Sequence, residues 1–311
     1  MSCYLAEPDP FPTPPPAQTR IFAAASTDTG RQRADNQDRA VIGDCATEQT
    51  WEAPVSVGLL AGPAGSFYAV VCDGMGGEAG GALASGLAVE TIVGAMRARW
   101  SRRDAEPAGS VARSEAQVAL ALVASLEAAS ARIKLAARAE PIYARMGTTA
   151  TLAAIAHGAL LCAQIGDSRA YVMRDGRLHQ VTEDQTMAEL LRKSGTMLPD
   201  QIRALVGPNV ILQALGSSTR LEVALTRTPL AHDDLVLLCS DGLYGVVDDT
   251  EIAAILHAAP ELANACDALV ARANAEGGPD NISCVVFRVL DDTLPSPTSP
   301  PLTTQLSPIA R

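Results

Sequence analysis

Residues 70–81 read VVCDGMGGEAGG and place a charged side chain at the end of an apolar run. Residues 70–72 have the composition of a buried β-strand, Asp73 follows directly, and five of the next eight residues are glycine. Burying a carboxylate is costly unless a cation neutralises it. The stretch therefore indicates that a cation lies next to Asp73.

Aspartate recurs in the same way at four other strand ends. Asp241 follows the apolar run LVLLC, Asp167 follows LLCAQI, and Asp38 and Asp280 each precede a run of strand composition. Taken singly, each is more simply a turn or helix-capping residue. As a set they are better explained by strand ends that converge on one rim of a sheet, where carboxylates repel one another unless a cation joins them.

The chemistry of these residues favours a pair of divalent metals. Carboxylate oxygens with room for water suit Mg²⁺ or Mn²⁺, and no histidine lies in these motifs, so zinc or iron is the weaker interpretation. Two such metals lower the pKa of a shared water and hold phosphoryl oxygens during displacement. Arg33 lies five residues before Asp38, and its planar fork could grip a phosphate. From position alone, a solvated surface arginine is the simpler interpretation.

Composition limits the remaining possibilities. The 311 residues are 48% hydrophobic and 19% charged, which predicts one large globular domain or at most two. A net charge of −11 argues against binding to nucleic acid or to an anionic membrane. Seven cysteines without a CxxC pair indicate neither a zinc site nor a disulfide framework, and so a reducing compartment. With no signal peptide and no membrane-spanning stretch in view, we expect a cytoplasmic protein.

The chain divides into a folded body and two tails. Residues 1–20 and 291–311 are rich in proline, the latter also in serine and threonine, and are expected to be disordered. Residues 21–290 form the predicted domain.

Within the body, strands and helices come in groups. Alanine-rich residues 79–100 and 112–138 predict a helical hairpin, two more helices are expected near 250–257 and 260–276, and Asp175-Gly176 marks a β-hairpin. Strand composition is found at residues 20–26, 38–43, 66–72, 148–157, 159–165, 169–174, 221–227, 234–240 and 282–289. Strands grouped together, then paired helices, then strands again predict an α+β layered domain.

The order of the motifs resembles that of a known family. TDTGRQRADNQD, VVCDGMGGEAGG, MGTTATLA, IGDSRAYV, VTEDQ, ALG, LLCSDGLYGVV and GGPDNISCVV follow one another as in metal-dependent serine/threonine protein phosphatases of the PPM type, especially the bacterial ones. Each motif is short, but the ordered combination, from about residue 25 to 289, is specific. The resemblance implies a central β-sandwich flanked by pairs of antiparallel helices, in α-β-β-α layers, with the metals at one edge.

The resemblance also implies a set of metal ligands. Asp73 would bridge two Mn²⁺ or Mg²⁺ ions, and the carbonyl of Gly74 would bind the second. Asp241 and Asp280 would complete the shell of the first metal, and Asp38 would act on the second. The glycines after Asp73 would let the backbone approach the metal closely.

Three further roles follow from the same resemblance. Asp167 would help to hold the third, weaker metal of many bacterial members, Arg33 would grip the substrate phosphate, and Thr149 would hydrogen-bond to metal-bound water. The implied reaction is hydrolysis of phosphoserine or phosphothreonine by direct attack of a hydroxide held by two metals. Phosphoproteins, a Ser/Thr kinase and a forkhead-associated protein are the implied partners.

Several positions depart from the family pattern. Met75 stands where many animal members have histidine, so no side chain is assigned as the general acid. Gln37 replaces the usual acid, and Gln185 and Gln213 replace the usual histidine and arginine. The flap segment, residues 186–210, looks shortened and lacks its usual His-Pro pair. These changes affect the expected specificity more than the expected chemistry.

Two other classes of function were weighed. A non-catalytic phosphoprotein-binding regulator with the same fold would typically have lost a metal aspartate, and all are present here. A two-metal nuclease or small-molecule phosphatase fits the motif order poorly, and the acidic charge further weakens the nuclease interpretation.

Overall fold

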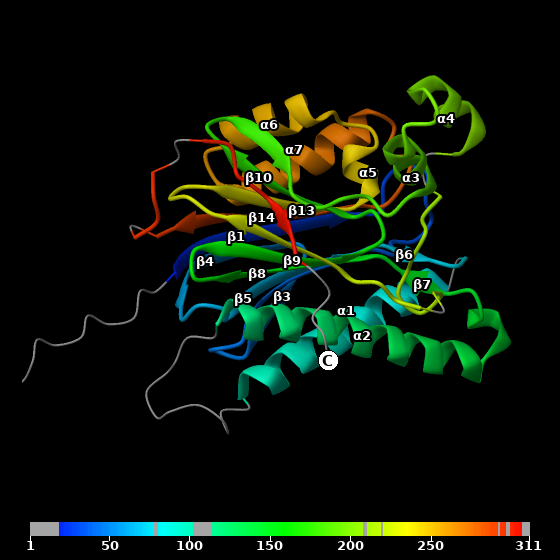
Figure 1. Ribbon diagram of the computed structural model, residues 1–311, viewed down its shortest axis with the longest axis horizontal. Helices are drawn as coiled ribbons and strands as arrows, with labels where there is room; N and C mark the ends of the chain where they lie inside the picture. The colour runs from blue at the N-terminus through cyan, green and yellow to red at the C-terminus, as the bar shows by residue number, and fades with distance from the viewer. Residues whose placement is uncertain are drawn as a thin grey trace, which may run out of the picture.

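The protein folds into four layers. The structure is a computed structural model that describes residues 19–77, 80–101, 114–207, 210–218, 220–291, 293–296 and 299–306. Two β-sheets pack face to face, and helices cover the outer face of each (Figure 1). Among the described strands, all pairings within the two sheets are antiparallel. This arrangement confirms the expected α-β-β-α sandwich.

The two sheets account for most of the described strands. The six-stranded sheet has the order β11 (Arg177–Gln180), β10 (Arg169–Arg174), β13 (Leu235–Cys239), β14 (Ile282–Leu290), β1 (Thr19–Asp28) and β4 (Val55–Gly62). The seven-stranded sheet has the order β15 (Thr304–Gln305), β12 (Ala224–Pro229), β9 (Ala159–Ile165), β8 (Ala150–Ala156), β5 (Phe67–Cys72), β2 (Arg39–Asp44) and β3 (Gln49–Glu52). Two-residue strands β6 (Gly74–Met75) and β7 (Gly147–Thr148) pair separately. All nine predicted strand runs are confirmed, and Asp175-Gly176 turns β10 into β11 with both residues at positive φ.

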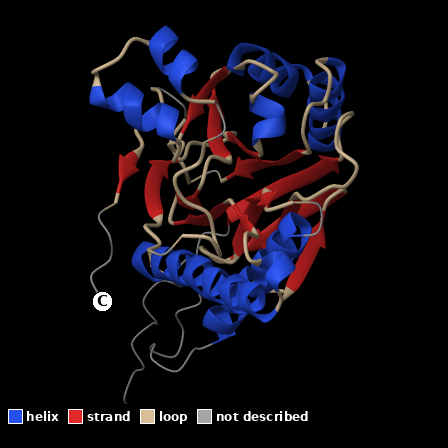
Figure 2. Ribbon diagram, turned by 90° about the vertical axis from the view of Figure 1, so that its right-hand side faces the viewer, coloured by secondary structure: helices blue, strands red, loops and turns tan. Residues whose placement is uncertain are grey.

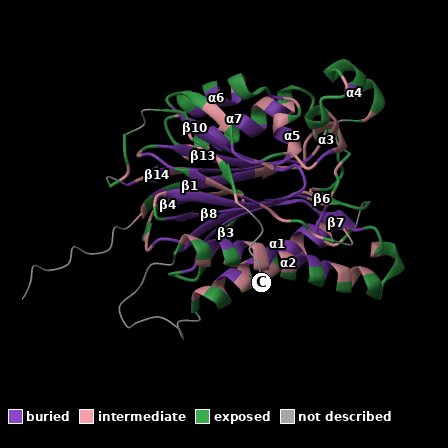
Figure 3. Ribbon diagram, viewed as in Figure 1, coloured by how far each residue is buried: buried purple, intermediate pink, exposed green. Residues whose placement is uncertain are grey.

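The core explains why the strands read as unbroken apolar runs. On β5, Val70 packs in the cluster under the first helix pair, and Val71 packs in the cluster between the sheets. Side chains alternate along a strand, so a strand covered on both faces must be apolar at every position. Figure 3 shows the strands as the most buried part of the molecule.

Four long helices form the outer layers. Helices α1 (Gly80–Ser101) and α2 (Glu115–Ala139) cover the seven-stranded sheet, and α6 (Asp249–Ala258) and α7 (Leu262–Ala275) cover the six-stranded sheet. All four confirm the predicted helices. At the start of α2, Ser114 and Gln117 form a reciprocal capping box. None of the described helices is both long and apolar enough to cross a membrane.

Short helices gather at one end of the sandwich. They are α3 (Met187–Ser194), α4 (Pro199–Leu205) and α5 (Asp241–Tyr244), and a 3₁₀ turn spans Pro141–Tyr143 (Figure 1). Helices α3 and α4 lie in the flap segment and were not predicted from the sequence. Each spans about two turns, which is too short for a clear apolar period.

Only parts of the two predicted tails lie among the described residues. Residues 1–18 lie outside the described residues, and residues 19 and 20 already belong to β1. The prediction of disorder is wrong for residues 299–306. Residues of β15 pair with β12, Thr303 hydrogen-bonds to Thr228 at 2.9 Å, and Leu306 N donates to Leu225 O at 2.8 Å. An exposed strand edge offers unpaired backbone groups, and an extended segment can satisfy them.

A buried ion pair at the far end of β10 gives a test of stability. Both oxygens of Asp234 accept from Arg174, at 2.9 and 2.6 Å, and Asp234 is 1% exposed. Replacing Asp234 by alanine leaves the arginine charge buried and unpaired, so we expect the free energy of unfolding to fall by about 3 kcal/mol. Urea denaturation would measure it. Asp175→Asn in the exposed β10–β11 turn is the control, and equal stability of the two variants would contradict the expectation.

Candidate metal centre

The predicted site residues meet at the end of the sandwich that carries the short helices, the end that Figure 2 faces. A cavity of about 600 Å³ opens there. Seven of the eight predicted residues line it: Arg33, Asp73, Gly74, Thr149, Asp167, Asp241 and Asp280. The eighth, Asp38, is 1% exposed and is bonded to Ser240, the residue before Asp241.

Antiparallel pairing brings the aspartates together. Asp73 ends β5 and Asp38 precedes its neighbour β2, so the two flank the same edge of the seven-stranded sheet. Asp241 and Asp280 flank the neighbours β13 and β14 of the six-stranded sheet in the same way. Asp167 lies where the chain passes from β9 in one sheet to β10 in the other. The five carboxylates therefore come from both sheets.

Asp38 is the most enclosed of the five. Its Oδ2 accepts from Ser240 Oγ at 2.7 Å, and its backbone N–H donates to Asn36 Oδ1 at 3.0 Å. Among the described residues, its Oδ1 has no hydrogen-bond partner. A buried carboxylate oxygen that accepts no hydrogen bond can be satisfied by a cation.

Asp73 is fixed through its backbone, which leaves its carboxyl to the cavity. Its N–H donates to Thr149 Oγ1 at 3.0 Å, and its carbonyl accepts from Thr148 Oγ1 and Thr149 N, both at 2.8 Å. Thr149 Oγ1 also lies 2.6 Å from Ser168 Oγ. Thr149 was predicted to contact water at the metal. In this structure its hydroxyl contacts Asp73 and Ser168.

Gly74 lies in close contact with the backbone of two other segments. A Cβ at this position would lie 2.3 Å from the carbonyl oxygen of Gly81 and 2.6 Å from that of Gln37. Gln37 itself donates from Nε2 to Gly77 O at 3.1 Å. The chain after Asp73 is therefore packed directly against the first turn of α1.

Arg33 is paired with one of the acids. Its Nη2 lies 2.6 Å from Asp280 Oδ2, and 55% of the arginine side chain is exposed. Since a guanidinium has five donors, Arg33 can keep this bond and still reach a ligand in the cavity.

The electrostatics of the site are unfavourable without a cation. Burial raises the pKa of Asp38 to about 7, and the charges of Asp241 and Asp280 push it the same way against the hydrogen bond from Ser240. Burial, and then repulsion from Asp241, raises the pKa of Asp167 to about 7. The pKa values of Asp73 and Asp241 are also raised, first by burial and then by neighbouring carboxylates.

These residues fit a hard divalent cation. The candidate metal ligands are oxygen atoms, and Oδ1 of Asp38 accepts no hydrogen bond among the described residues. Burial and repulsion between the carboxylates raise the pKa values of Asp38 and Asp167. In the part of the chain that the structure describes, no three His, Cys, Asp or Glu side chains converge as a complete ligand set. Water would have to supply much of the coordination, as is usual for Mg²⁺.

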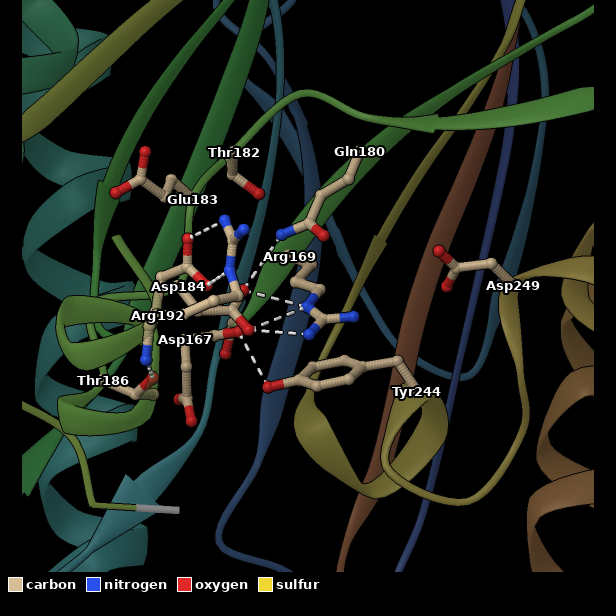
Figure 4. Close-up of polar contacts among 12 residues, drawn as sticks. Asp167, Arg169, Gln180, Thr182, Glu183, Asp184, Thr186, Arg192, Tyr244 and Asp249 are labelled. Carbon is tan, nitrogen blue, oxygen red and sulfur yellow. Dashed lines mark hydrogen bonds and ion pairs between the residues drawn. The ribbon is translucent and has the colours of Figure 1, made fainter. Parts of the chain in front are cut away.

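A network that sequence reasoning missed holds Asp167 in place (Figure 4). The Arg169 guanidinium lies 3.6 Å from the centre of the Tyr244 ring and donates to Asp184 from Nε and Nη2, at 2.9 and 2.6 Å. The Tyr244 hydroxyl donates to the backbone carbonyl of Asp167 at 3.0 Å. Asp184 stands three residues before Met187, the first residue of α3. The network therefore joins Asp167, helix α5 and the residues that directly precede the flap segment.

Two departures from the family pattern contact one another. Gln213 Nε2 donates to Gln185 Oε1 at 3.4 Å, and the same Oε1 accepts from Gly166 N at 2.9 Å. Gln185 N donates in turn to Gly166 O at 3.0 Å. Gln185 thus binds the residue before Asp167 through both its backbone and its side chain.

A second cavity, of about 820 Å³, adjoins the first and was not foreseen. It shares Arg33, Asp167, Asp241 and Asp280 with the metal centre and continues along α3 and α4 past Ile202. Helices α3 and α4 form part of its wall. Because the sequence did not predict these helices, it did not predict the cavity.

Comparison with known proteins identifies the family. A model described as protein phosphatase 2C matches residues 57–285. The serine/threonine phosphatase Stp of Listeria welshimeri is 30% identical over 266 residues, which is 86% of this chain and 95% of Stp. The chain therefore belongs to the protein phosphatase 2C family, the PPM-type enzymes that its motifs resemble.

Solved structures agree with the fold and the expected metal. The catalytic domain of the serine/threonine protein phosphatase PstP in complex with two manganese ions matches with a TM-score of 0.67 and 32% identity, covering 88% of this chain and 100% of that domain. PppA, described as a key regulatory component of T6SS in Pseudomonas aeruginosa, matches with a TM-score of 0.65 and 28% identity, covering 87% of this chain and 98% of PppA. The fold is thus one that holds manganese in a relative.

Proposed function

We propose that this protein is a metal-dependent phosphatase that removes phosphate from phosphoserine and phosphothreonine in other proteins. The observation that carries this proposal is the meeting of Asp73, Asp167, Asp241 and Asp280, from both sheets, at one cavity that also contains Arg33, with the buried Asp38 bonded to the residue before Asp241. The two manganese ions bound to PstP support Mn²⁺ as the metal, with Mg²⁺ as the alternative.

Each ligand has an assigned place. Asp73 would bridge two ions, with the Gly74 carbonyl on the second. Asp241 and Asp280 would complete the first, and Asp38 would act on the second directly or through water. When bound, the metal pair lowers the pKa of water and stabilises charge on phosphate oxygens.

The other residues bind and orient. Arg33 lines the cavity and would grip the phosphate. Asp167 would help to hold a third, weaker ion, and the hydroxyl of Thr149 fixes the backbone of Asp73. Met75, which lines the same cavity, has no proton to give, so no side chain is assigned as the acid for the leaving group.

The partners follow from the substrate class. Phosphoproteins would bind, and we infer that a Ser/Thr kinase supplies them. A forkhead-associated protein is a further candidate partner from the family resemblance, and the match to PppA, described as a key regulatory component of T6SS, supports only a regulatory role. The six described cysteines are all buried, free thiols, which supports a reducing cytoplasm as the location.

The test is turnover of a phosphothreonine peptide by the full chain with Mn²⁺, with Mg²⁺ and with EDTA. We expect turnover with Mn²⁺ that falls at least about 100-fold in EDTA. A phosphotyrosine peptide and duplex DNA serve as substrate controls. A folded protein without turnover in either metal would contradict the proposal and favour the binding-only regulator, and cleavage of DNA alone would favour the nuclease.

A further inference from the structure

We propose that Asn281 is a positioning residue that sets the place of Arg33 in the cavity, an inference that rests on the proposed phosphate-binding role of Arg33. Asn281 lies between Asp280 and the start of β14 and is 5% exposed. It has no place among the metal ligands assigned above.

The Asn281 side chain binds three backbone groups of the loop that carries Arg33. Its Oδ1 accepts from Gln37 N at 2.8 Å, and its Nδ2 donates to Thr29 O at 2.8 Å and to Asp35 O at 2.9 Å. The amide thus uses its oxygen and both N–H donors on one loop, residues 29–37, which connects β1 to β2. The bonded groups lie on both sides of Arg33, so the amide fixes the loop on either side of it.

Backbone contacts join the first half of the loop to residues 278–280, which directly precede Asn281. Arg31 N and Gln32 N donate to Gly278 O at 2.8 and 3.2 Å. At Gly30, with φ of 79°, a Cβ would lie 2.2 Å from the carbonyl oxygen of Asp280. Among the described residues, residues 33–35 form no such backbone bond, so this part of the loop depends more on the Asn281 amide.

The Arg33 side chain is half exposed, and within the described part of the chain it is hydrogen-bonded to Asp280 alone. A long, exposed side chain reaches a fixed point reliably only when its backbone is fixed. Loss of the Asn281 amide should therefore widen the range of positions that the guanidinium samples.

Asp38 has separate support, which lets the two roles be distinguished. Ser240 Oγ holds its carboxyl at 2.7 Å, and Asn36 Oδ1 holds its N–H at 3.0 Å. The Ser240 bond comes from the segment after β13, outside the loop, and does not depend on the Asn281 amide. The expected defect is thus in handling the substrate phosphate rather than in holding the metal.

The test is a double-mutant cycle in the full chain with Mn²⁺ and a phosphothreonine peptide. Arg33→Ala should lower kcat/KM by about 10- to 100-fold, the loss of a charge-assisted contact, and Asn281→Ala by about 10-fold. The double variant should match Arg33→Ala within about twofold, because Asn281 acts through Arg33. The Mn²⁺ concentration for half-maximal activity should stay within about twofold of the wild type.

Two further variants complete the design. Asn281→Asp keeps the size but loses both donors and should behave as Asn281→Ala, which covers the case that the alanine variant fails to fold. Asn274→Ala is the matched control: its amide donates to Asp28 at 3.0 Å, at the end of β1, and binds no part of the Arg33 loop. It should retain kcat/KM within about twofold.

The results distinguish the phosphate-binding role of Arg33 from the positioning role of Asn281. Wild-type kcat/KM in Arg33→Ala would remove the proposed role of Arg33 itself. A defective Arg33→Ala with an unaffected Asn281→Asp, a double variant whose loss is the product of the two single losses, or a changed Mn²⁺ requirement in Asn281→Ala would overturn the positioning role.

Discussion

Replacing Asp73 with asparagine will lower kcat on a phosphothreonine peptide by at least about 1,000-fold at saturating Mn²⁺. The change keeps the size of the side chain but removes the charge assigned to both ions. The backbone bonds of Asp73 to Thr148 and Thr149 do not involve the carboxyl, so the strand end should keep its place. Steady-state kinetics with a metal titration would measure the loss.

The same variant should not be less stable than the wild type in EDTA. Repulsion from Asp38 and Asp241 helps to raise the pKa of Asp73, and the amide removes one charge from that group. Asp241→Asn should lose activity in the same way, and Asp175→Asn should lose none. An Asp73→Asn protein that kept a tenth of the wild-type kcat would rule out the bridging role.

Mn²⁺ will bind the metal pair of the metal-free protein about 10-fold more tightly at pH 8 than at pH 6. The pKa values of Asp38 and Asp167 are raised to about 7, so both carboxyls are largely protonated at pH 6 and must release a proton to bind metal. Asp38 thus contributes about tenfold to binding at the pair over this interval, and Asp167 about tenfold to binding of the third, weaker ion. Calorimetry in buffers of different ionisation enthalpy would give both the affinity and the protons released.

The same shifts give the sign of the stability change without metal. The folded pKa lies above the unfolded value, so the folded state holds more protons between about pH 4 and pH 7, and stability falls as pH rises through that window. Asp38→Asn should remove this tenfold pH dependence at the metal pair, and Asp167→Asn should remove it for the weaker ion only. Equal affinity at pH 6 and pH 8 would show that the carboxyls are already ionised.

The meeting of the candidate ligands at one end of the sandwich was predictable because each of them lies in a local pattern. Asp73 and Asp241 lie at the ends of apolar runs, and Asp38 and Asp280 lie at the starts of such runs. Because both faces of each sheet are buried, the strands are continuous apolar segments that can be recognised in the sequence. Antiparallel pairing then brings the strand ends together, so short motifs sufficed to predict the site.

The missed features depend on contacts between distant residues. The bond from Asn281 to Gln37 spans 244 positions in the chain, and the motif marked the asparagine only by its place after Asp280. Helices α3 and α4 are too short for a period, and the second cavity exists only because of them. The pairing of β15 with β12 was missed because proline-rich composition is typical of disordered tails, although such a segment can also pair with a sheet edge in an extended form.

The origin of the aspartates in both sheets has a thermodynamic consequence. A cation shared between Asp73 on one sheet and Asp241 on the other would cross-link the two halves of the sandwich, so opening the interlayer core would require releasing the ion. Metal affinity and the cohesion of the sheets would then be linked quantities. Scarcity of the metal would loosen the scaffold at the same time as it stops turnover.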